Sequence, residues 1–276
     1  MVLRKHNGFS LIELMIAMAI STVVGLLIYQ VHSRQQKSHV AQQLSVEMQQ
    51  NLRAAMSFVR REIRMAGYDP AESSGAGIQT AGAGSIGFSL DLNGDNTTTD
   101  QNESLTYGFT SGDVDGNGVA DSGALSLMRQ DAGGTPSTSE IAYDIRAIAF
   151  AYAFDHDDGD PDDQLDTSGG NVIWAFDADG DGLLDTALDS NRDGIVDTDD
   201  IAGGSPLTGP PLFLPSNLPI NRIRAVRVWV LARTRFPLRG FSDNETYVVG
   251  VQRVTPGDNY QHCQVVDTVI CRNLFL

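Results

Sequence analysis

The pattern of apolar and polar residues divides the chain into a long N-terminal helix and a strand-rich remainder. The longest apolar run extends from Leu14 to Tyr29, about the length that crosses a bilayer as a helix. Glu13 is the single charge near its start, and Arg4, Lys5 and His6 precede it. A basic stretch before an apolar run is typical of a secretory signal or a membrane anchor. We therefore expect the rest of the chain to lie on the far side of the membrane.

The same helix is predicted to continue to about Ala66. No proline occurs before Pro70, and Gly67 is suited to end a helix. Beyond the membrane run, apolar residues recur every three or four positions, at Leu44, Met48, Leu52, Ala55, Val59 and Ile63. The expected helix therefore has two halves. Residues 9–30 form a membrane-spanning half, and residues 31–67 form an amphipathic half that packs on a globular head.

The remainder, residues 68–276, is predicted to be a β-rich head. Residues 72–83 and 203–219 are rich in turn-forming residues and are expected to be loops. Elsewhere β-branched and aromatic residues gather in short runs. The expected strands are Ser85–Leu90, Ser104–Phe109, Ala124–Arg129, Ile141–Phe154, Asn171–Phe176, Arg222–Thr234 and Thr246–Val254. We predict an α+β fold, in which the long N-terminal α-helix packs on an antiparallel β-sheet head with long loops.

Gly8-Phe9-Ser10-Leu11-Ile12-Glu13 resembles the type IV prepilin signal, which is Gly-Phe-x-x-x-Glu before an apolar helix. The resemblance implies that a prepilin peptidase cuts between Gly8 and Phe9, removes residues 1–8, and leaves Phe9 to be N-methylated. The resemblance also implies that residues 9–30 move into a filament core on assembly, where Glu13 would meet the N-terminal amine of a neighbouring subunit. A carboxylate costs about 2.5–3.5 kcal/mol in a membrane helix but is tolerable beside a buried cation. A plain membrane anchor, the alternative, has little reason to keep Glu13.

Two further segments resemble PilW-type minor pilins of type IV pili. They are residues 60–68, at the predicted helix end, and Cys271-Arg272-Asn273-Leu274, which resembles a C-terminal strand. The resemblance implies a prepilin held in the inner membrane by one span, with its head in the periplasm. Assembly at a pilus tip or in a priming complex, with other minor and major pilins, would bring it to the cell surface. A J-type pseudopilin of type II secretion and a calcium-dependent surface adhesin are the alternatives.

Acidic residues are concentrated in the middle of the chain, at about residues 155–202. The net charge is −16, which argues against nucleic acid as a partner, and Asp155 to Asp200 contains sixteen Asp and one Arg. Two adjacent segments fit the calcium-loop pattern Asp-x-Asp/Asn-x-Asp-Gly. The candidate ligands are Asp177, Asp179, Asp181, Leu183 (carbonyl) and Asp185 in the first, and Asp189, Asn191, Asp193, Ile195 (carbonyl), Asp197 and Asp200 in the second.

A third candidate loop contains Asp113, Asp115, Asn117 and Asp121, and a weaker fourth contains Asp91, Asn93 and Asp95. The loops resemble dockerin or thrombospondin type 3 calcium repeats more than EF-hands, since no flanking helices are evident. Soluble acidic turns without an ion are the alternative. We expect structural calcium as the one cofactor, because unneutralised carboxylates would repel one another.

Cys263 and Cys271 are the only cysteines, and in an exported protein a close pair predicts a disulfide. A metal site that adds His262 is the alternative.

The arginines of the strand from Arg222, with Arg235 and Arg239 beyond it, form either a solvated face or a contact with an acidic neighbouring subunit. No nucleophile, P-loop, zinc or dinucleotide motif occurs, so we expect a structural protein and not an enzyme.

Overall fold

The computed structural model describes residues 10–156, 165–168, 170–189, 191, 193–197, 199–200, 214 and 218–274. The predicted cleavage site, Gly8 and Phe9, lies outside the described residues, as do 157–164 and 201–213 of the acidic middle and the loop after it. The chain forms two compact units, Met1–Val46 and Glu47–Leu276. The first unit is helical, and the second is the head.

One helix, α1, spans Leu11–Ile63 and contributes to both units. It confirms the predicted continuous helix to within a few residues of its expected ends. The backbone N–H of Ser10 donates to Glu13 Oε2 at 2.9 Å. A serine followed three residues later by a glutamate is the capping-box arrangement, which satisfies amide groups left unpaired at a helix start. Beyond the other end, Gly67 has φ 76°, the left-handed conformation that glycine adopts most easily.

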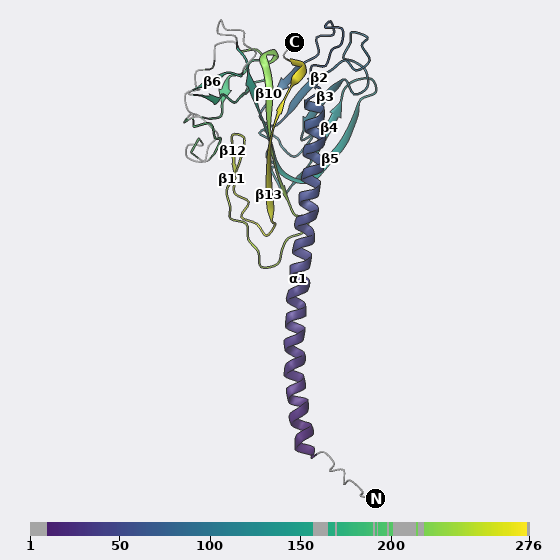
Figure 1. Ribbon diagram of the computed structural model, residues 1–276, viewed down its shortest axis with the longest axis vertical. Coiled ribbons are helices and arrows are strands. Elements are labelled where there is room, and N and C mark those ends of the chain that lie inside the picture. Colours follow the sequence, from purple (N-terminus) through teal and green to yellow (C-terminus); the bar gives the residue numbers. More distant parts are fainter. Residues whose placement is uncertain are drawn as a thin grey trace, which may run out of the picture. The chain divides into compact units, whose positions relative to one another are not determined.

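The head is built on one large antiparallel sheet (Figure 1). Its main path has the order β1-β2-β3-β4-β5-β10-β13, and β8 and β9 extend it beside β5. The strands are β1 (Ile78–Ala81), β2 (Ile86–Ser89), β3 (Ser104–Gly108), β4 (Leu125–Asp131), β5 (Ser137–Phe154), β8 (Ala175–Phe176), β9 (Thr186–Ala187), β10 (Ile223–Arg233) and β13 (His262–Ile270). Two short hairpins complete the described strands: β6 (Thr167–Ser168) with β7 (Asn171–Val172), and β11 (Tyr247–Val249) with β12 (Gln252–Val254).

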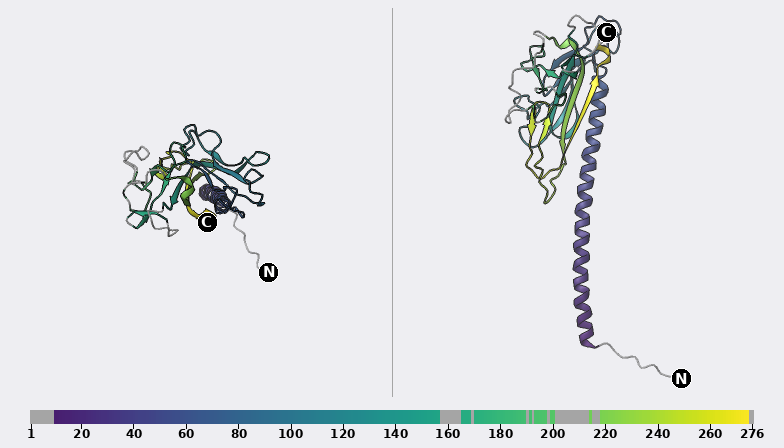
Figure 2. Two further views of the ribbon diagram at one scale, coloured as in Figure 1. Left: turned by 90° about the horizontal axis from the view of Figure 1, so that it is seen from above. Right: turned by 60° about the vertical axis from the view of Figure 1, so that its left-hand side comes forward.

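The head part of α1 packs on this sheet, which curves around the helix in the end-on view of Figure 2. Leu52, Val59 and Ile63 of α1 are buried, and so are Phe150 of β5 and Val228 of β10. All five belong to one hydrophobic cluster. The amphipathic pattern predicted for this half of the helix is thus confirmed, as is the α+β architecture of a helix on an antiparallel sheet.

Two local predictions in the first and last strands were wrong. Ile78–Ala81 was expected to be loop, but it forms β1 and pairs with β2. Its buried ends, Ile78 and Ala81, join the core although the flanking sequence is rich in glycine and serine. The C-terminal strand was expected at residues 271–274, which instead form a 3₁₀ turn, η3 (Arg272–Leu274). The last strand, β13, lies just before it.

Two predicted strands are interrupted. Thr246–Val254 is the hairpin β11–β12, because Gly250 at φ 58° supports a turn in its middle. Asn171–Phe176 is divided into β7 and β8, which pair with different strands. Each half therefore finds its own hydrogen-bonding partner.

The predicted disulfide is contradicted by the structure. Cys263 and Cys271 are both free thiols. Cys263 lies near the start of β13 and Cys271 follows its end. Eight extended residues span roughly 26 Å, far more than the distance of about 7 Å that a disulfide allows between Cα atoms. The alternative metal site fails for the same reason, and His262 instead places Nδ1 3.0 Å from Asp243 Oδ2.

Candidate functional site

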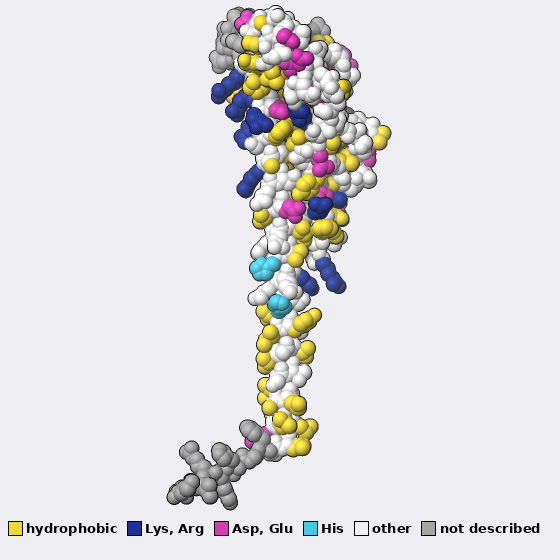
Figure 3. Space-filling model, turned by 90° about the vertical axis from the view of Figure 1, so that its right-hand side faces the viewer, with side chains coloured by type: hydrophobic (Ala, Val, Ile, Leu, Met, Phe, Trp, Pro, Cys, Tyr) yellow, Lys and Arg dark blue, Asp and Glu magenta, His cyan; other side chains and the backbone are white. Residues whose placement is uncertain are grey.

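The first unit presents an apolar helix whose described side chains are mostly exposed. Residues 10–32 are all exposed, and the run from Leu14 to Tyr29 is predominantly apolar; Figure 3 shows apolar side chains along it. Within the described chain, α1 is the one helix long and apolar enough to cross a membrane, by length and composition. A helix that is apolar on all sides needs a nonpolar environment, which lipid or a bundle of similar helices supplies. Glu13 lies in its first turn, where the helix dipole favours a negative charge.

Loop 1, residues 177–185, gathers carboxylates around one point. Asp177 is buried, and its two oxygens accept backbone N–H groups of the loop at 2.7 and 2.9 Å. Asp185 Oδ1 accepts the N–H of Ala178 at 3.2 Å, which closes the loop. Ligand atoms of Asp177, Asp179 and Asp185 lie within 4.8 Å of one another. These three carboxylates are thus close enough to share one cation, and Asp181 points its Oδ1 to the N–H of Leu183 at 2.9 Å.

Loop 2, residues 189–200, is described except for residues 190, 192 and 198. Asp189 is buried, and its oxygens accept the N–H groups of Asp193 at 3.2 Å and Gly194 at 2.7 Å. Asp200 is also buried and accepts the N–H groups of Asn191 at 3.2 Å and Asp197 at 3.1 Å. The first and last predicted ligands of this loop thus both accept N–H groups from within it. The predicted carbonyl ligands Leu183 and Ile195 stay predictions.

Loop 3, residues 113–121, repeats the arrangement of loop 1. Asp113 accepts the N–H groups of Asn117 at 3.1 Å and Gly118 at 2.8 Å, and Asp121 accepts the N–H of Val114 at 2.8 Å. Burial and the neighbouring Asp115 carboxylate raise the pKa of Asp113, although these N–H groups oppose the shift. A carboxylate in such a position is stabilised in its charged form by a nearby cation.

Loop 4 begins at Asp91 and has the same hydrogen-bond pattern. Asp91 accepts the N–H groups of Gly94 at 2.6 Å and Asn96 at 3.0 Å. Glu103 is buried beside it and accepts the N–H of Leu92 at 2.9 Å, the role that Asp185 has in loop 1. Sequence reasoning missed Glu103, because its position twelve residues after Asp91 does not fit the spacing of the other loops.

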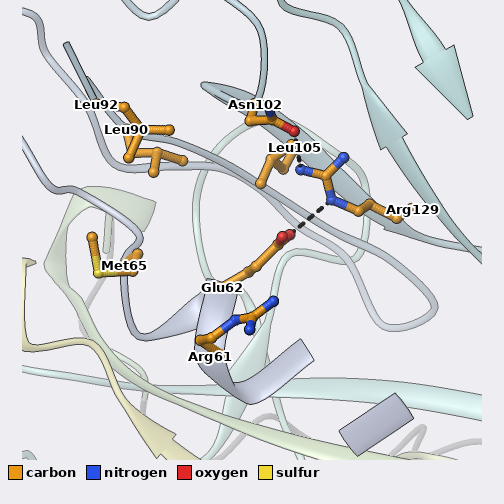
Figure 4. Close-up of a pocket in the computed structure, with 8 residues that line it drawn as sticks. All are labelled: Arg61, Glu62, Met65, Leu90, Leu92, Asn102, Leu105 and Arg129. Atoms are coloured by element: carbon orange, nitrogen blue, oxygen red, sulfur yellow. Dashed lines mark hydrogen bonds and ion pairs between the residues drawn. The ribbon is translucent and has the colours of Figure 1, made fainter. Parts of the chain in front are cut away.

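Sequence reasoning also missed a polar network at the end of α1. Glu62 Oε2 accepts hydrogen bonds from the Tyr107 hydroxyl and from Arg129 Nε at 2.9 Å. Arg129 also donates to Asn102 Oδ1 at 2.9 Å. The network forms one wall of a pocket of about 390 Å³, whose other side is apolar (Figure 4). The lining residues are Arg61, Glu62, Met65, Leu90, Leu92, Asn102, Leu105 and Arg129.

Comparison with known families identifies the N-terminal segment. Residues 3–29 match the family model described as the prokaryotic N-terminal methylation motif. The chain has a prepilin-type N-terminus. The match covers Gly8, Phe9 and Glu13, so the prepilin resemblance inferred from these residues is confirmed. It includes the whole apolar run from Leu14 to Tyr29 that α1 exposes.

Among solved structures, the chain is similar to a type IV-like pilin from Thermus thermophilus. The two chains are 15% identical, the TM-score is 0.42, and the match covers 82% of this chain and 97% of the other. No curated protein matches the chain significantly. The prepilin-type N-terminus and the helix-on-sheet head point to a structural protein. The likeness of the acidic loops to dockerin or thrombospondin repeats stays a prediction.

Proposed function

We propose that this chain is a minor pilin of a type IV pilus. The observation that carries the proposal is the methylation motif on a fully exposed apolar helix that continues into a β-rich head. The chain would enter the inner membrane as a prepilin, with its head in the periplasm. A prepilin peptidase would then cut between Gly8 and Phe9, and the mature chain would join other pilins at the tip or in a priming complex.

Assembly in this proposal is a transfer of α1 from lipid to a bundle of similar helices. Both environments cover the apolar side chains, so the exchange costs little hydrophobic free energy. Glu13 distinguishes the two environments. In lipid its carboxylate has the capping N–H of Ser10. In the bundle it would also gain the charged amine of a neighbouring mature chain, which favours assembly.

Deletion of the gene in the source bacterium tests the proposal, with surface pili and secreted enzymes measured in the same cultures. A minor pilin predicts lost or sparse pili and normal secretion, restored by the wild-type gene. Normal pili with blocked secretion would instead identify a type II secretion pseudopilin.

We also propose that loops 1 and 2, and with them loop 3, bind structural calcium. Calcium takes six to eight oxygen ligands, and the carboxylates of Asp177, Asp179 and Asp185 already lie within reach of one ion. Asp177, Asp189 and Asp200 are buried carboxylates, and a bound cation would offset the cost of burying them. The ion would hold the loops in place; no catalytic step is attached to it.

A further inference from the structure

The connection from β10 to β11 presents a rigid basic and aromatic surface. We define the basic-aromatic loop as Arg235, Phe236, Arg239 and Phe241, all of which are exposed. Phe236 is 61% exposed and Phe241 36% exposed. No Asp or Glu occurs from Ile201 to Ser242. Two aromatic and two arginine side chains are therefore exposed in this loop, on a chain whose net charge is −16.

Backbone hydrogen bonds hold this loop in one conformation. The Leu238 N–H donates to the Asn259 carbonyl at 2.7 Å, and Asn259 Nδ2 donates to the Phe241 carbonyl at 2.8 Å. The Thr234 hydroxyl donates to the Phe236 carbonyl at 3.1 Å. A loop that is already ordered loses little conformational entropy when a partner binds. The backbone that carries the exposed rings is thus held in place and is not a frayed segment.

The arginines of β10 itself are largely used within the chain. Arg227 lies over the Trp174 ring at 4.3 Å and Arg233 over the Tyr260 ring at 4.1 Å. Arg224 donates to the Asn221 carbonyl at 3.0 Å. The strand is therefore not simply a solvated basic face. In the basic-aromatic loop, Arg239 and Arg235 are exposed, although Arg235 also lies in a pocket that Tyr143 and Asp144 line.

The loop lies at the end of the head where α1 enters it. Arg235 lies over the Tyr143 ring at 5.5 Å, and the Tyr143 hydroxyl donates to Glu47 Oε1 at 3.1 Å. Glu47 is the first residue of the head. In Figure 1 the connection from β10 to β11 is at the opposite end of the head from the connection between β2 and β3.

That opposite end carries the opposite charge in its loops. Glu72, Asp95 and Asp100 are exposed there, with the exposed apolar side chain of Leu92. The Asp91 N–H donates to the Tyr68 carbonyl at 2.7 Å, which places these loops beside the end of α1. No Lys or Arg occurs from Met65 to Met128. The loops at this end thus present exposed carboxylates and an exposed leucine, which the basic-aromatic loop would fit, and Arg61 of α1 lines the same pocket as Leu92.

We propose that the basic-aromatic loop docks on the acidic end of a neighbouring pilin-type subunit. The inference rests on the proposed function, because it requires such a neighbour. Arg and aromatic residues are enriched at the centres of protein interfaces, and complementary charges set orientation and association rate. An anionic bilayer fits less well, because the net charge of the whole chain opposes its approach.

Photo-crosslinking of the full chain in its own bacterium tests the docking. Phe236 is replaced by benzoylphenylalanine, which keeps an aromatic ring, and products are identified by mass spectrometry after illumination. The expected product joins position 236 to an Asp- and Glu-rich segment of a chain with a prepilin-type N-terminus. A lipid adduct, or no protein adduct from chains that have entered filaments, would overturn the proposal.

Reversing the charge of the loop's arginines tests whether the crosslink depends on that charge. The double variant Arg235→Glu and Arg239→Glu should lower the crosslink yield roughly tenfold or more, whereas Arg53→Glu, an exposed arginine of α1, should not. Equal membrane levels of the variants show that each one folds. An equal loss in both variants would overturn the docking. The deletion phenotype tests the proposed role in a pilus, and the crosslink tests the docking surface. Normal pili in the deletion strain, together with this crosslink pattern, would therefore reject the role in a pilus and still support the docking surface.

Discussion

Glu62 shows how a single side chain joins the helix to the sheet. It lies on α1, whereas its partners Tyr107 and Arg129 lie on β3 and β4. Arg129 has little exposed surface, and burial alone would lower its pKa, yet the Glu62 carboxylate raises it. Burial, together with the same carboxylate, raises the pKa of Tyr107. Arg129 and Tyr107 therefore keep their protons at neutral pH and donate them in hydrogen bonds to Glu62.

We predict that Glu62→Ala destabilises the head by about 2–4 kcal/mol, because it leaves the Arg129 charge buried without its carboxylate. Chemical denaturation of the full chain in detergent measures the change. Glu47→Ala is the matched control, since Glu47 is an exposed glutamate of the same helix, and it should change stability by less than about 0.5 kcal/mol. Similar losses in the two variants would show that the Arg129 pair has no special role.

Asp243 is a second residue whose ionised side chain stabilises the folded head. Its Oδ2 accepts hydrogen bonds from the Tyr247 hydroxyl at 3.0 Å and the His262 backbone N–H at 3.2 Å. Burial opposes ionisation, but the Glu245 N–H, His262 and Tyr247 outweigh it and lower the pKa of Asp243. The carboxylate thus stabilises the fold above its unfolded pKa of about 3.9, and that contribution is lost as pH falls through the lower folded value.

Asp243→Asn should lower the free energy of unfolding by about 1–3 kcal/mol at pH 7. The difference from wild type should shrink below about pH 4, because the unfolded wild-type carboxyl then takes up a proton that the folded carboxylate takes up only at lower pH. Unfolding measured from pH 7 to pH 3 follows both effects. Asp258→Asn, a more exposed carboxylate 3.9 Å from the His262 ring, serves as control. A difference that stays constant with pH would argue against a charge effect.

At the scale of elements, β13 determines the chemistry of the two cysteines. It holds them at opposite ends of one extended strand, and Cys271 is buried while Cys263 is partly exposed. Burial raises the pKa of Cys271 to about 12. A thiol reagent should therefore label one cysteine in the native chain and two after denaturation without reductant. No labelled thiol after denaturation would instead indicate the disulfide.

The calcium loops form the second element-scale prediction. Calcium added to chelator-treated protein should raise Tm by roughly 5–10 °C at a hundredfold excess over Kd. Magnesium should act more weakly, because it demands a tighter octahedral site. The double variant Asp177→Asn and Asp189→Asn should lose most of the calcium shift, whereas Asp267→Asn, outside the loops, should keep it. If calcium does not change the Tm of the wild-type protein, the proposal that these loops bind calcium is wrong.

Elements with a strong period were predictable from the sequence, and the weakly patterned ones were not. The repeat through Leu52, Val59 and Ile63 predicted the packing face of α1 because one face of a helix buries every third or fourth residue. β13 was missed because many of its side chains are only partly buried, so its alternation is weak. In the sites, local spacing predicted loops 1 to 3. The ion pair between Glu62 and Arg129 joins residues 67 positions apart, and no local sequence pattern predicts such a contact.

For the whole molecule, Glu13 separates membrane anchoring from assembly. Anchoring depends on the apolar run and gains from losing a carboxylate in lipid. Assembly, as proposed, depends on the charge of Glu13 meeting a neighbouring amine. Glu13→Gln keeps an oxygen that can accept the Ser10 N–H, so helix capping is preserved while the charge is lost.

Glu13→Gln should therefore leave the chain in the inner membrane at wild-type level and lower its amount in sheared pili roughly tenfold or more, the scale of one lost buried charge pair. Immunoblots of membrane and pilus fractions measure both pools. Glu13→Asp, which keeps the charge, should restore part of the pilus pool. Equal incorporation of the glutamine variant would mean that Glu13 serves the helix cap alone, and that helix packing without a charge pair drives assembly.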